Sequence, residues 1–145
     1  GIGDRVYMLA KQVSGLEQEV DTVTIVRYGE GKGMTAHRDY PWDAFGFVIY
    51  LSDDFDGGET FFELDELKTI SPEKGKMIIF PGHEIVHGVN PVHNGDRYTI
   101  AGWIEDPTLS PPKDDPWWSG KWPCYDSYCA DFGLDPHGPW QKPTP

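Results

Sequence analysis

Apolar and polar residues alternate along short segments that follow one another through most of the chain. The segments are rich in Val, Ile, Phe and Tyr, which favour strands, and each is followed by a stretch typical of a turn. The expected strands are DTVTIVRY (21–28), FGFVIYLS (45–52), ETFFEL (59–64), KGKMIIFP (74–81), EIVHGVNPV (84–92) and RYTIAGWIED (97–106). Short strands at this spacing predict an all-β core, either a sandwich or a barrel.

Two turns between the expected strands have strong sequence signals. HNGD (93–96) contains the Asn-Gly pair that favours a two-residue hairpin, so we expect the strands on either side of it to pair. Gly57-Gly58, at the end of DDFDGG, permits a tight turn that larger residues would strain. The acids before this glycine pair do not have the spacing of a calcium-binding loop, and we interpret them as a solvated turn.

The two ends of the chain differ from this β-rich centre. In residues 2–13, apolar residues recur at the spacing of one helix face, which predicts a short N-terminal helix. Residues 107–145 are rich in Pro and Trp and have little periodicity. We expect one domain over residues 1–106 and an irregular C-terminal extension over residues 107–145. The extension is expected to pack on the core, because large aromatic side chains tend to be buried; a lid or a partner-binding arm is the alternative.

Length and charge limit the class of protein. A chain of 145 residues can bury the core of one domain. Its formal net charge of −12 argues against binding to nucleic acid or to an anionic membrane, because those partners require clustered Lys and Arg. No apolar run is long enough to span a membrane and no signal peptide is evident, so the sequence favours a soluble, cytoplasmic protein. Cys124 and Cys129 leave the redox compartment open, and removal of a segment before Gly1 stays open as well.

Residues 83–87, HEIVH, match the H-E-x-x-H signature of zinc metalloproteases. In those enzymes the motif lies on a helix, which brings both histidines to one face. Here Pro81-Gly82 precedes the motif, a glycine and a proline follow it, and the β-branched residues inside it are poor helix formers. We therefore expect a strand that carries His87, and no ligand role for His83. The zinc metalloprotease is kept as an alternative.

A second pattern is the H-x-D pair formed by His37 and Asp39. On a strand, side chains two residues apart point to the same side, so this pair can bind one metal ion. The expected strand with His87 can supply a third ligand. Two histidines and one carboxylate form the facial triad of non-haem Fe(II) enzymes. For the H-x-D pair by itself, a surface turn is the alternative; His93 is expected in such a turn.

Arg97 begins the last expected strand, in which alternate residues share one face: Arg97, Thr99, Ala101 and Trp103. An arginine inside a barrel is costly unless it pairs with an anion. A dicarboxylate ligand would provide a carboxylate for the planar guanidinium, and the hydroxyl of Thr99 could bind beside it. The alternative is that Arg97 points to solvent next to Asp96.

The sequence resembles the 2-oxoglutarate- and Fe(II)-dependent oxygenases, and within them the prolyl 4-hydroxylase group, which includes the hypoxia-sensing prolyl hydroxylases. The similar stretches are VTIVRYGEGKGMTAHRD, FVIYLSDDFDGGETFFE, SPEKGKMIIFPG, VHGVNPV and GDRYTIAGWIED. They cover most of residues 20–106 in the order and spacing of the family, and they do not extend to residues 107–145. The resemblance implies that the all-β core is a double-stranded β-helix, or jelly roll.

The resemblance also implies roles for individual residues and a set of cofactors. The implied iron ligands are His37, Asp39 and His87. The residues implied to hold 2-oxoglutarate are Arg97, Tyr28, Tyr50 and Thr99. The candidate substrate contacts are Trp103, which matches a tryptophan of the barrel wall, and Arg38. Fe(II), 2-oxoglutarate and O2 are the implied cofactors and cosubstrates, with ascorbate as an optional accessory.

The implied reaction couples the conversion of 2-oxoglutarate into succinate and CO2 with the hydroxylation of a C–H bond. The preferred substrate is a prolyl residue in a peptide or protein, including a proline-rich one. Free proline, another amino acid or small molecule, and a lysyl side chain are alternatives. Asp39 favours hydroxylation over halogenation, because related halogenases have Gly or Ala at that position. A non-catalytic jelly-roll binding module with a vestigial metal site is the alternative from another class.

Overall fold

The computed structural model describes residues 1, 4–5, 8–9, 11–12, 19–40 and 42–106, with the backbone alone for residues 19–22. The strands in these ranges are β1 (Glu19–Tyr28), β2 (Met34–His37), β3 (Asp43–Tyr50), β4 (Asp56–Gly57), β5 (Thr60–Glu63), β6 (Leu67–Ile70), β7 (Met77–Phe80), β8 (Val86–Val89), β9 (Val92–His93) and β10 (Arg97–Glu105). Of the twelve residues in the helix expected over residues 2–13, six fall outside the described residues. The extension over residues 107–145, with both cysteines, falls entirely outside them, and both expectations stay predictions.

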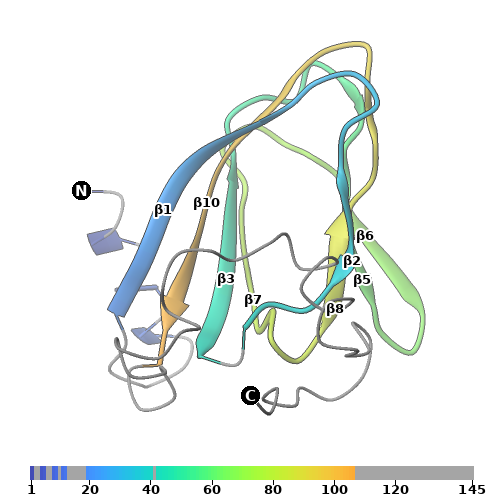
Figure 1. Ribbon diagram of the computed structural model, residues 1–145. Coiled ribbons are helices and arrows are strands. Elements are labelled where there is room, and N and C mark those ends of the chain that lie inside the picture. The colour runs from blue at the N-terminus through green and yellow to red at the C-terminus, as the bar shows by residue number, and fades with distance from the viewer. Residues whose placement is uncertain (2–3, 6–7, 10, 13–18, 41, 107–145) are drawn as a thin grey trace, which may run out of the picture.

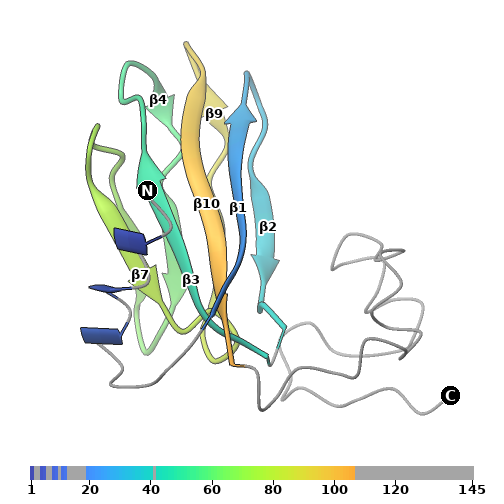
Figure 2. The same cartoon turned by 90° about the vertical axis from the view of Figure 1, so that its left-hand side faces the viewer.

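Most of the strands form two antiparallel sheets that face each other (Figure 1). The main sheet has the order β1-β10-β3-β7, and the second sheet has the order β2-β8-β5-β6. The short strands β4 and β9 pair at one end of the molecule (Figure 2). Because the chain passes repeatedly from one sheet to the other, the fold is a jelly roll, as the family resemblance implies. Within the described ranges, no helix is long and apolar enough to cross a membrane.

The two faces of the main sheet differ in chemistry, as the alternation along β10 predicts. Arg97, Thr99 and Trp103 line a cavity that residues of both sheets enclose. Of the intervening residues, Ile100 and Ile104 pack into an apolar cluster on the other face. The members of the cluster are Phe45, Phe47, Ile49, Met77, Ile79, Ile100 and Ile104. The main sheet therefore has an apolar cluster on one face and directs Arg97 and Thr99 into the cavity from the other.

β6 was not predicted from the sequence. Three of its four residues are exposed, so the alternation that signals a half-buried strand is absent. It forms because it pairs with β5 along its whole length. The strand is thus specified by its partner and not by its own pattern.

The prediction for residues 93–96 was partly wrong. The turn is present, with positive φ angles of 55° at Asn94 and 153° at Gly95. The flanking strands do not form a hairpin, because β9 pairs with β4 whereas β10 pairs with β1 and β3. Glu30 ties the turn to the β1–β2 connection: its carboxylate accepts a hydrogen bond from the N–H of Asn94 and lies 2.9 Å from Nδ1 of His93. His93 is exposed, as expected.

Candidate metal and cosubstrate site

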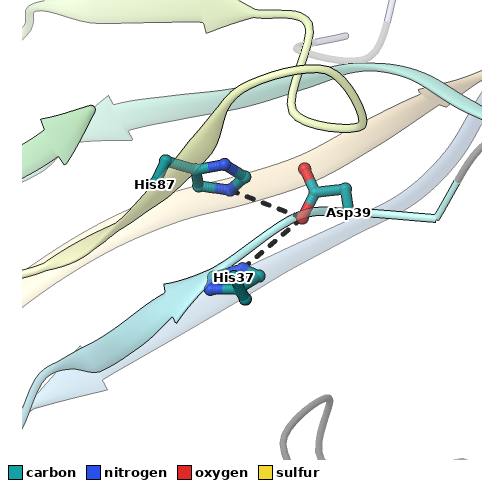
Figure 3. Close-up of side chains that lie close together, drawn as sticks. All are labelled: His37, Asp39 and His87. Atoms are coloured by element: carbon teal, nitrogen blue, oxygen red, sulfur yellow. Dashed lines mark ion pairs between the residues drawn. The ribbon is translucent and has the colours of Figure 1, made fainter. Parts of the chain in front are cut away.

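The three predicted metal ligands lie together between the sheets (Figure 3). His37 is the last residue of β2 and pairs directly with His87 on β8. The Nε2 atoms of His37 and His87 lie 3.5 and 3.4 Å from Oδ1 of Asp39. The exposed fractions of the three side chains are 14%, 7% and 7% for His37, Asp39 and His87. A metal ion bound among them would therefore be largely shielded from bulk water.

Asp39 reaches the site from outside a strand, which differs from the prediction. β2 ends at His37, and Asp39 lies in the connection to β3. Its backbone N–H donates a 3.0 Å hydrogen bond to the carbonyl of Gly82, in the β7–β8 connection. The H-x-D spacing does bring both side chains to one metal site, but a contact with a distant segment holds the carboxylate in place.

Hydrogen bonds on the far side of each imidazole prepare the two histidines for metal binding. Nδ1 of His37 lies 2.8 Å from the carbonyl oxygen of Thr35, and Nδ1 of His87 lies 2.8 Å from that of Ile85. A carbonyl only accepts, so we assign the proton to each Nδ1, and each neutral ring directs the Nε2 lone pair toward Asp39. Two lone pairs and a carboxylate then converge without a proton between them, an arrangement that a cation stabilises. The residues therefore fit an Fe(II) ion.

Protons and metal ions compete for these imidazoles, which predicts the pH dependence of binding. In the metal-free protein, burial raises the pKa of Asp39, but hydrogen bonds and charges from His37 and His87, present when Nε2 of those rings carries a proton, lower it more, so the net pKa lies well below its usual range. Asp39 therefore stays ionised, and a proton on either Nε2 would occupy the lone pair that a metal ion needs.

We expect the affinity for Co(II), an air-stable substitute for Fe(II), to fall as the pH is lowered from about 7.5 to about 5.5. Up to two protons would be taken up for each ion released, one at each imidazole. Calorimetric titration in buffers of different ionisation enthalpy measures this number. An affinity that does not change over the range would contradict ligation by two neutral histidines.

Arg97 lines the same cavity and is buried, with only 2% of its surface exposed. Its Nε donates to the carbonyl of Gly58 at 3.0 Å, and Nη2 donates to Oγ1 of Thr60 at 3.3 Å. Nη1 lies 3.5 Å from Oγ1 of Thr99. These partners are neutral, and no carboxylate among the described residues pairs with the guanidinium. Burial lowers the pKa of Arg97, although Tyr50 opposes this shift. A buried cation with neutral partners predicts an anionic ligand.

Two tyrosine rings flank Arg97. The guanidinium carbon lies 5.2 Å from the ring centre of Tyr50 and 5.7 Å from that of Tyr28. Tyr28 lines the cavity, whereas Tyr50 is fully buried and its hydroxyl lies 2.6 Å from Oγ1 of Thr60. Sequence analysis missed Thr60, which lines the cavity and joins Tyr50 to Arg97. The alternation in ETFFEL was its signal, because it places Thr60 on the same buried face of β5 as Phe62.

The cavity has a volume of about 110 Å³ and is lined by the three candidate metal ligands and by Arg97. Trp103 lines it, and its role as a substrate contact stays a prediction. Much of the remaining lining is apolar and includes Val48, Phe80 and Ala101. Arg38 is not among the lining residues, and its role as a substrate contact stays a prediction.

Gly58 has a conformation and a location that explain why a larger residue does not fit next to Arg97. Its φ angle is +66°, and a Cβ there would lie 2.8 Å from Cε2 of Phe55 and 3.1 Å from Cδ of Arg97. Gly75, with a φ of +87°, is a matched control, because a Cβ there would meet nothing within 4 Å. Left-handed backbone costs an L-residue about 1–2 kcal/mol at either position.

We expect Gly58→Ala to destabilise the protein more than Gly75→Ala and to weaken 2-oxoglutarate binding, because only the added methyl group at position 58 displaces the guanidinium. Urea denaturation measures the stability of both variants, and ligand titration measures their affinity for 2-oxoglutarate. Equal effects of the two substitutions on both properties would show that Gly58 has no role beyond its turn.

The H-E-x-x-H segment does not form the helix that a zinc protease requires. Residues 82–85 form a turn and a bend, and β8 begins at Val86, so His87 lies on a strand. His83 is outside the cluster of metal-ligating side chains, and its Nε2 lies 3.3 Å from a carboxylate oxygen of Glu84. The prediction that only the second histidine of the motif belongs to the site agrees with this geometry.

A family model provides an independent test of this interpretation. The model for the 2OG-Fe(II) oxygenase superfamily matches residues 23–105, which include the three candidate ligands and Arg97. The chain belongs to the 2OG-Fe(II) oxygenase superfamily. The resemblance seen in the sequence is therefore confirmed. Fe(II) is the cofactor of this family, and 2-oxoglutarate and O2 are its cosubstrates. The His37, Asp39 and His87 side chains fit Fe(II).

Curated relatives of this oxygenase-family chain include hydroxylases. A PKHD-type hydroxylase of Synechococcus sp. (strain CC9902) is 35% identical over 98 residues, which cover 62% of this chain and 44% of the relative. Prolyl 3-hydroxylase 2 of Mus musculus is 39% identical over 77 residues, which cover 50% of this chain and 10% of the relative. The chain thus spans less than half the length of either relative.

Solved structures with the same fold include prolyl hydroxylases. A prolyl-4-hydroxylase from Pseudomonas putida superposes with a TM-score of 0.62 at 23% identity, over 70% of this chain and 60% of that one. The viral collagen prolyl hydroxylase from Paramecium Bursaria Chlorella virus-1 superposes with a TM-score of 0.60 at 22% identity, over 72% of both chains. At this level of identity the likeness confirms the jelly-roll fold.

Proposed function

We propose that this chain is the catalytic domain of a 2-oxoglutarate-dependent hydroxylase that acts on prolyl residues in a peptide or protein. The observation that carries the proposal is one cavity that joins a largely buried His-Asp-His cluster to a buried arginine, which has no acidic partner among the described residues. A metal site alone would serve many reactions. The added anion site favours a carboxylate cosubstrate next to the metal.

His37, Asp39 and His87 would hold the iron, which when bound supplies the activation of O2 and the oxidation of 2-oxoglutarate. Three protein ligands leave room on the metal for small molecules, as in other facial-triad sites. The carbonyls of Thr35 and Ile85 keep the two imidazoles in the tautomer that binds metal through Nε2. The chain thus contributes ligand orientation before any metal arrives.

Arg97 would bind the distal carboxylate of 2-oxoglutarate. Its guanidinium is held by Gly58, Thr60 and Thr99, and Tyr50 fixes Thr60 in turn. Because these partners are already in place, little side-chain freedom is lost when the carboxylate binds. The hydroxyls of Thr99 and Tyr28 are the candidates for further contacts with the cosubstrate.

Apolar residues of the cavity would exclude water from the reacting groups. Val48, Phe80 and Ala101 line the space along with Trp103. A dry cavity strengthens the attraction between Arg97 and a carboxylate and protects a reactive oxidant from side reactions. Trp103 is also the candidate contact for the substrate.

The names of the relatives support a prolyl substrate. They include prolyl 3-hydroxylase 2, and one solved neighbour is a prolyl hydroxylase from Trichoplax adhaerens in complex with a hypoxia inducible factor oxygen degradation domain peptide. A peptide or protein is therefore favoured over free proline. A proline-rich sequence around the target and the use of ascorbate belong to the same proposal.

A coupled assay tests the substrate class. The full chain, loaded with Fe(II) and supplied with 2-oxoglutarate, O2 and ascorbate, is incubated with a library of proline-containing peptides and with the same peptides carrying alanine for proline. We expect a mass gain of one oxygen atom in the proline set only, with one succinate formed for each hydroxylation. Free proline and lysyl peptides are run in parallel.

Other outcomes of the assay would select other functions. Hydroxylation of free proline or of lysyl peptides alone would replace the substrate class but keep the enzyme class. If the chain binds metal but consumes no 2-oxoglutarate, either alone or in the presence of any of the peptides, it would be a non-catalytic jelly-roll module. Peptide cleavage that requires zinc and no 2-oxoglutarate would restore the metalloprotease interpretation.

A further inference from the structure

Gly82, in the β7–β8 connection, contacts the metal site without contributing a side chain to it. A Cβ at this position would overlap Oδ2 of Asp39 and would lie 2.8 Å from its Cγ. The same Cβ would lie 3.1 Å from Cε1 of His87. Gly82 is not among the glycines with a positive φ angle, so its backbone is open to any L-residue. Lack of space next to the ligands is therefore what requires a glycine here.

A second glycine contacts the same carboxylate oxygen from β3. A Cβ at Gly46 would lie 3.1 Å from Oδ2 of Asp39 and 3.3 Å from two ring atoms of Phe80. Gly46 also has no positive φ angle. The Asp39 carboxylate thus has two different sides: Oδ1 faces the two histidines, and Oδ2 lies against two glycine backbones.

The main chain holds the same residue. The N–H of Asp39 donates a 3.0 Å hydrogen bond to the carbonyl of Gly82, and the N–H of Gly82 donates a 2.9 Å hydrogen bond to the carbonyl of Phe80. The β7–β8 connection is therefore tied to the end of β7 and in turn holds Asp39. Asp39 lies beyond the end of β2, so the strand pairing of β2 with β8 does not include it.

We propose that Gly82 and Gly46 are positioning residues that seat Oδ2 of Asp39 and thereby direct Oδ1 toward the metal. An alanine at position 82 would force the carboxylate to rotate or the β7–β8 connection to move away. Either change separates Asp39 from the two histidines. The inference rests on the proposed role of Asp39 as an iron ligand.

Metal affinity is the first test. Gly82→Ala is expected to lower the affinity for Co(II) by at least roughly tenfold, the loss typical when an outer partner of a metal ligand is removed. The Co(II) absorption spectrum should change as well, because the ligand set is displaced. Gly33→Ala is the control, since a Cβ there would overlap the carbonyl oxygen of Val89, and its three nearest atoms belong to Val89 and Asn90 and not to a metal ligand. An unchanged affinity and spectrum in Gly82→Ala would overturn the proposal.

The second test uses the metal-free protein, so it does not depend on activity. Unfolding midpoints are measured for Gly82→Ala in the wild-type and Asp39→Ala backgrounds. In the Asp39→Ala background, Gly82→Ala should lower the unfolding midpoint by no more than roughly half as much as in the wild type, because the carboxylate that the new Cβ meets is gone. The control Gly33→Ala should cause the same loss in both backgrounds. An equal loss for Gly82→Ala in both backgrounds would show that Gly82 acts only through the turn.

The test remains decisive if Gly82→Ala does not fold. Folding restored by Asp39→Ala would support the proposal directly. If Gly82→Ala does not fold in either background, Gly46→Ala is used in the same comparison. Its Cβ would lie 3.1 Å from Oδ2 of Asp39, a close contact that a small shift can relieve. Absence of Co(II) binding in the wild-type chain would instead contradict the proposed function, and the metal-free comparison would still report on the two glycines.

Discussion

The His87→Ala variant is expected to lose Fe(II) and Co(II) binding and all 2-oxoglutarate turnover, whereas His83→Ala keeps both. His87 pairs with His37 across β2 and β8, and its Nε2 lies 3.4 Å from the Asp39 carboxylate. Loss of a direct ligand should cost more than the roughly 10–100-fold that loss of an outer partner costs. His83 lies outside the cluster of metal-ligating side chains.

Anaerobic titration with Fe(II) and 2-oxoglutarate, followed by visible absorption, measures this difference. A charge-transfer band should form in the wild type and in His83→Ala and be absent in His87→Ala. Circular dichroism confirms that each variant is folded. If zinc binds only when both histidines of the H-E-x-x-H segment are present, the facial-triad assignment is wrong.

Arg97→Met is expected to abolish productive 2-oxoglutarate binding while Co(II) binding persists. The substitution removes the buried cation but keeps an unbranched side chain of similar length. Loss of one partner of a buried, hydrogen-bonded charge pair costs roughly 2–5 kcal/mol, equivalent to an affinity loss of about 30- to 4,000-fold. Part of this loss reflects the carbonyl of Gly58 and the hydroxyl of Thr60, which lose their donor.

Arg27→Met provides the matched control. Arg27 also lies in the main sheet, but its side chain is 60% exposed and pairs with Asp96 at 3.0 Å. Exposed ion pairs contribute little to stability. The affinity of Arg27→Met for 2-oxoglutarate and its turnover should therefore stay near the wild-type values. The KM for 2-oxoglutarate is measured for both variants. Their Co(II) affinity shows whether the metal site is intact. An equal rise in KM for both would indicate a general effect of net charge.

Local sequence patterns predicted most of the strands and the candidate chemistry. The alternation in RYTIAGWIED predicted that Arg97, Thr99 and Trp103 share a face, and all three line the cavity. The turn residues around 81–91 predicted that His87 lies on a strand. These inferences succeeded because side-chain direction along a strand depends on a period of two residues, which is visible in the sequence alone.

Family resemblance supplied what alternation could not. No local pattern pairs His37 with His87, fifty positions later in the chain, or assigns the tyrosines that flank Arg97. The similarity of ordered stretches implied these partners, and the fold brings them together.

By itself, the sequence determined the β-rich core, the polar face of the last strand and the set of candidate ligands. Only the tertiary structure decided that β6 exists, that residues 93–96 do not join a hairpin, and that Thr60 supports Arg97. It also decided that Gly82 lies against Asp39. The physical reason is that strand pairing and close packing join residues far apart in the chain, whereas alternation and turn signals report only on immediate neighbours.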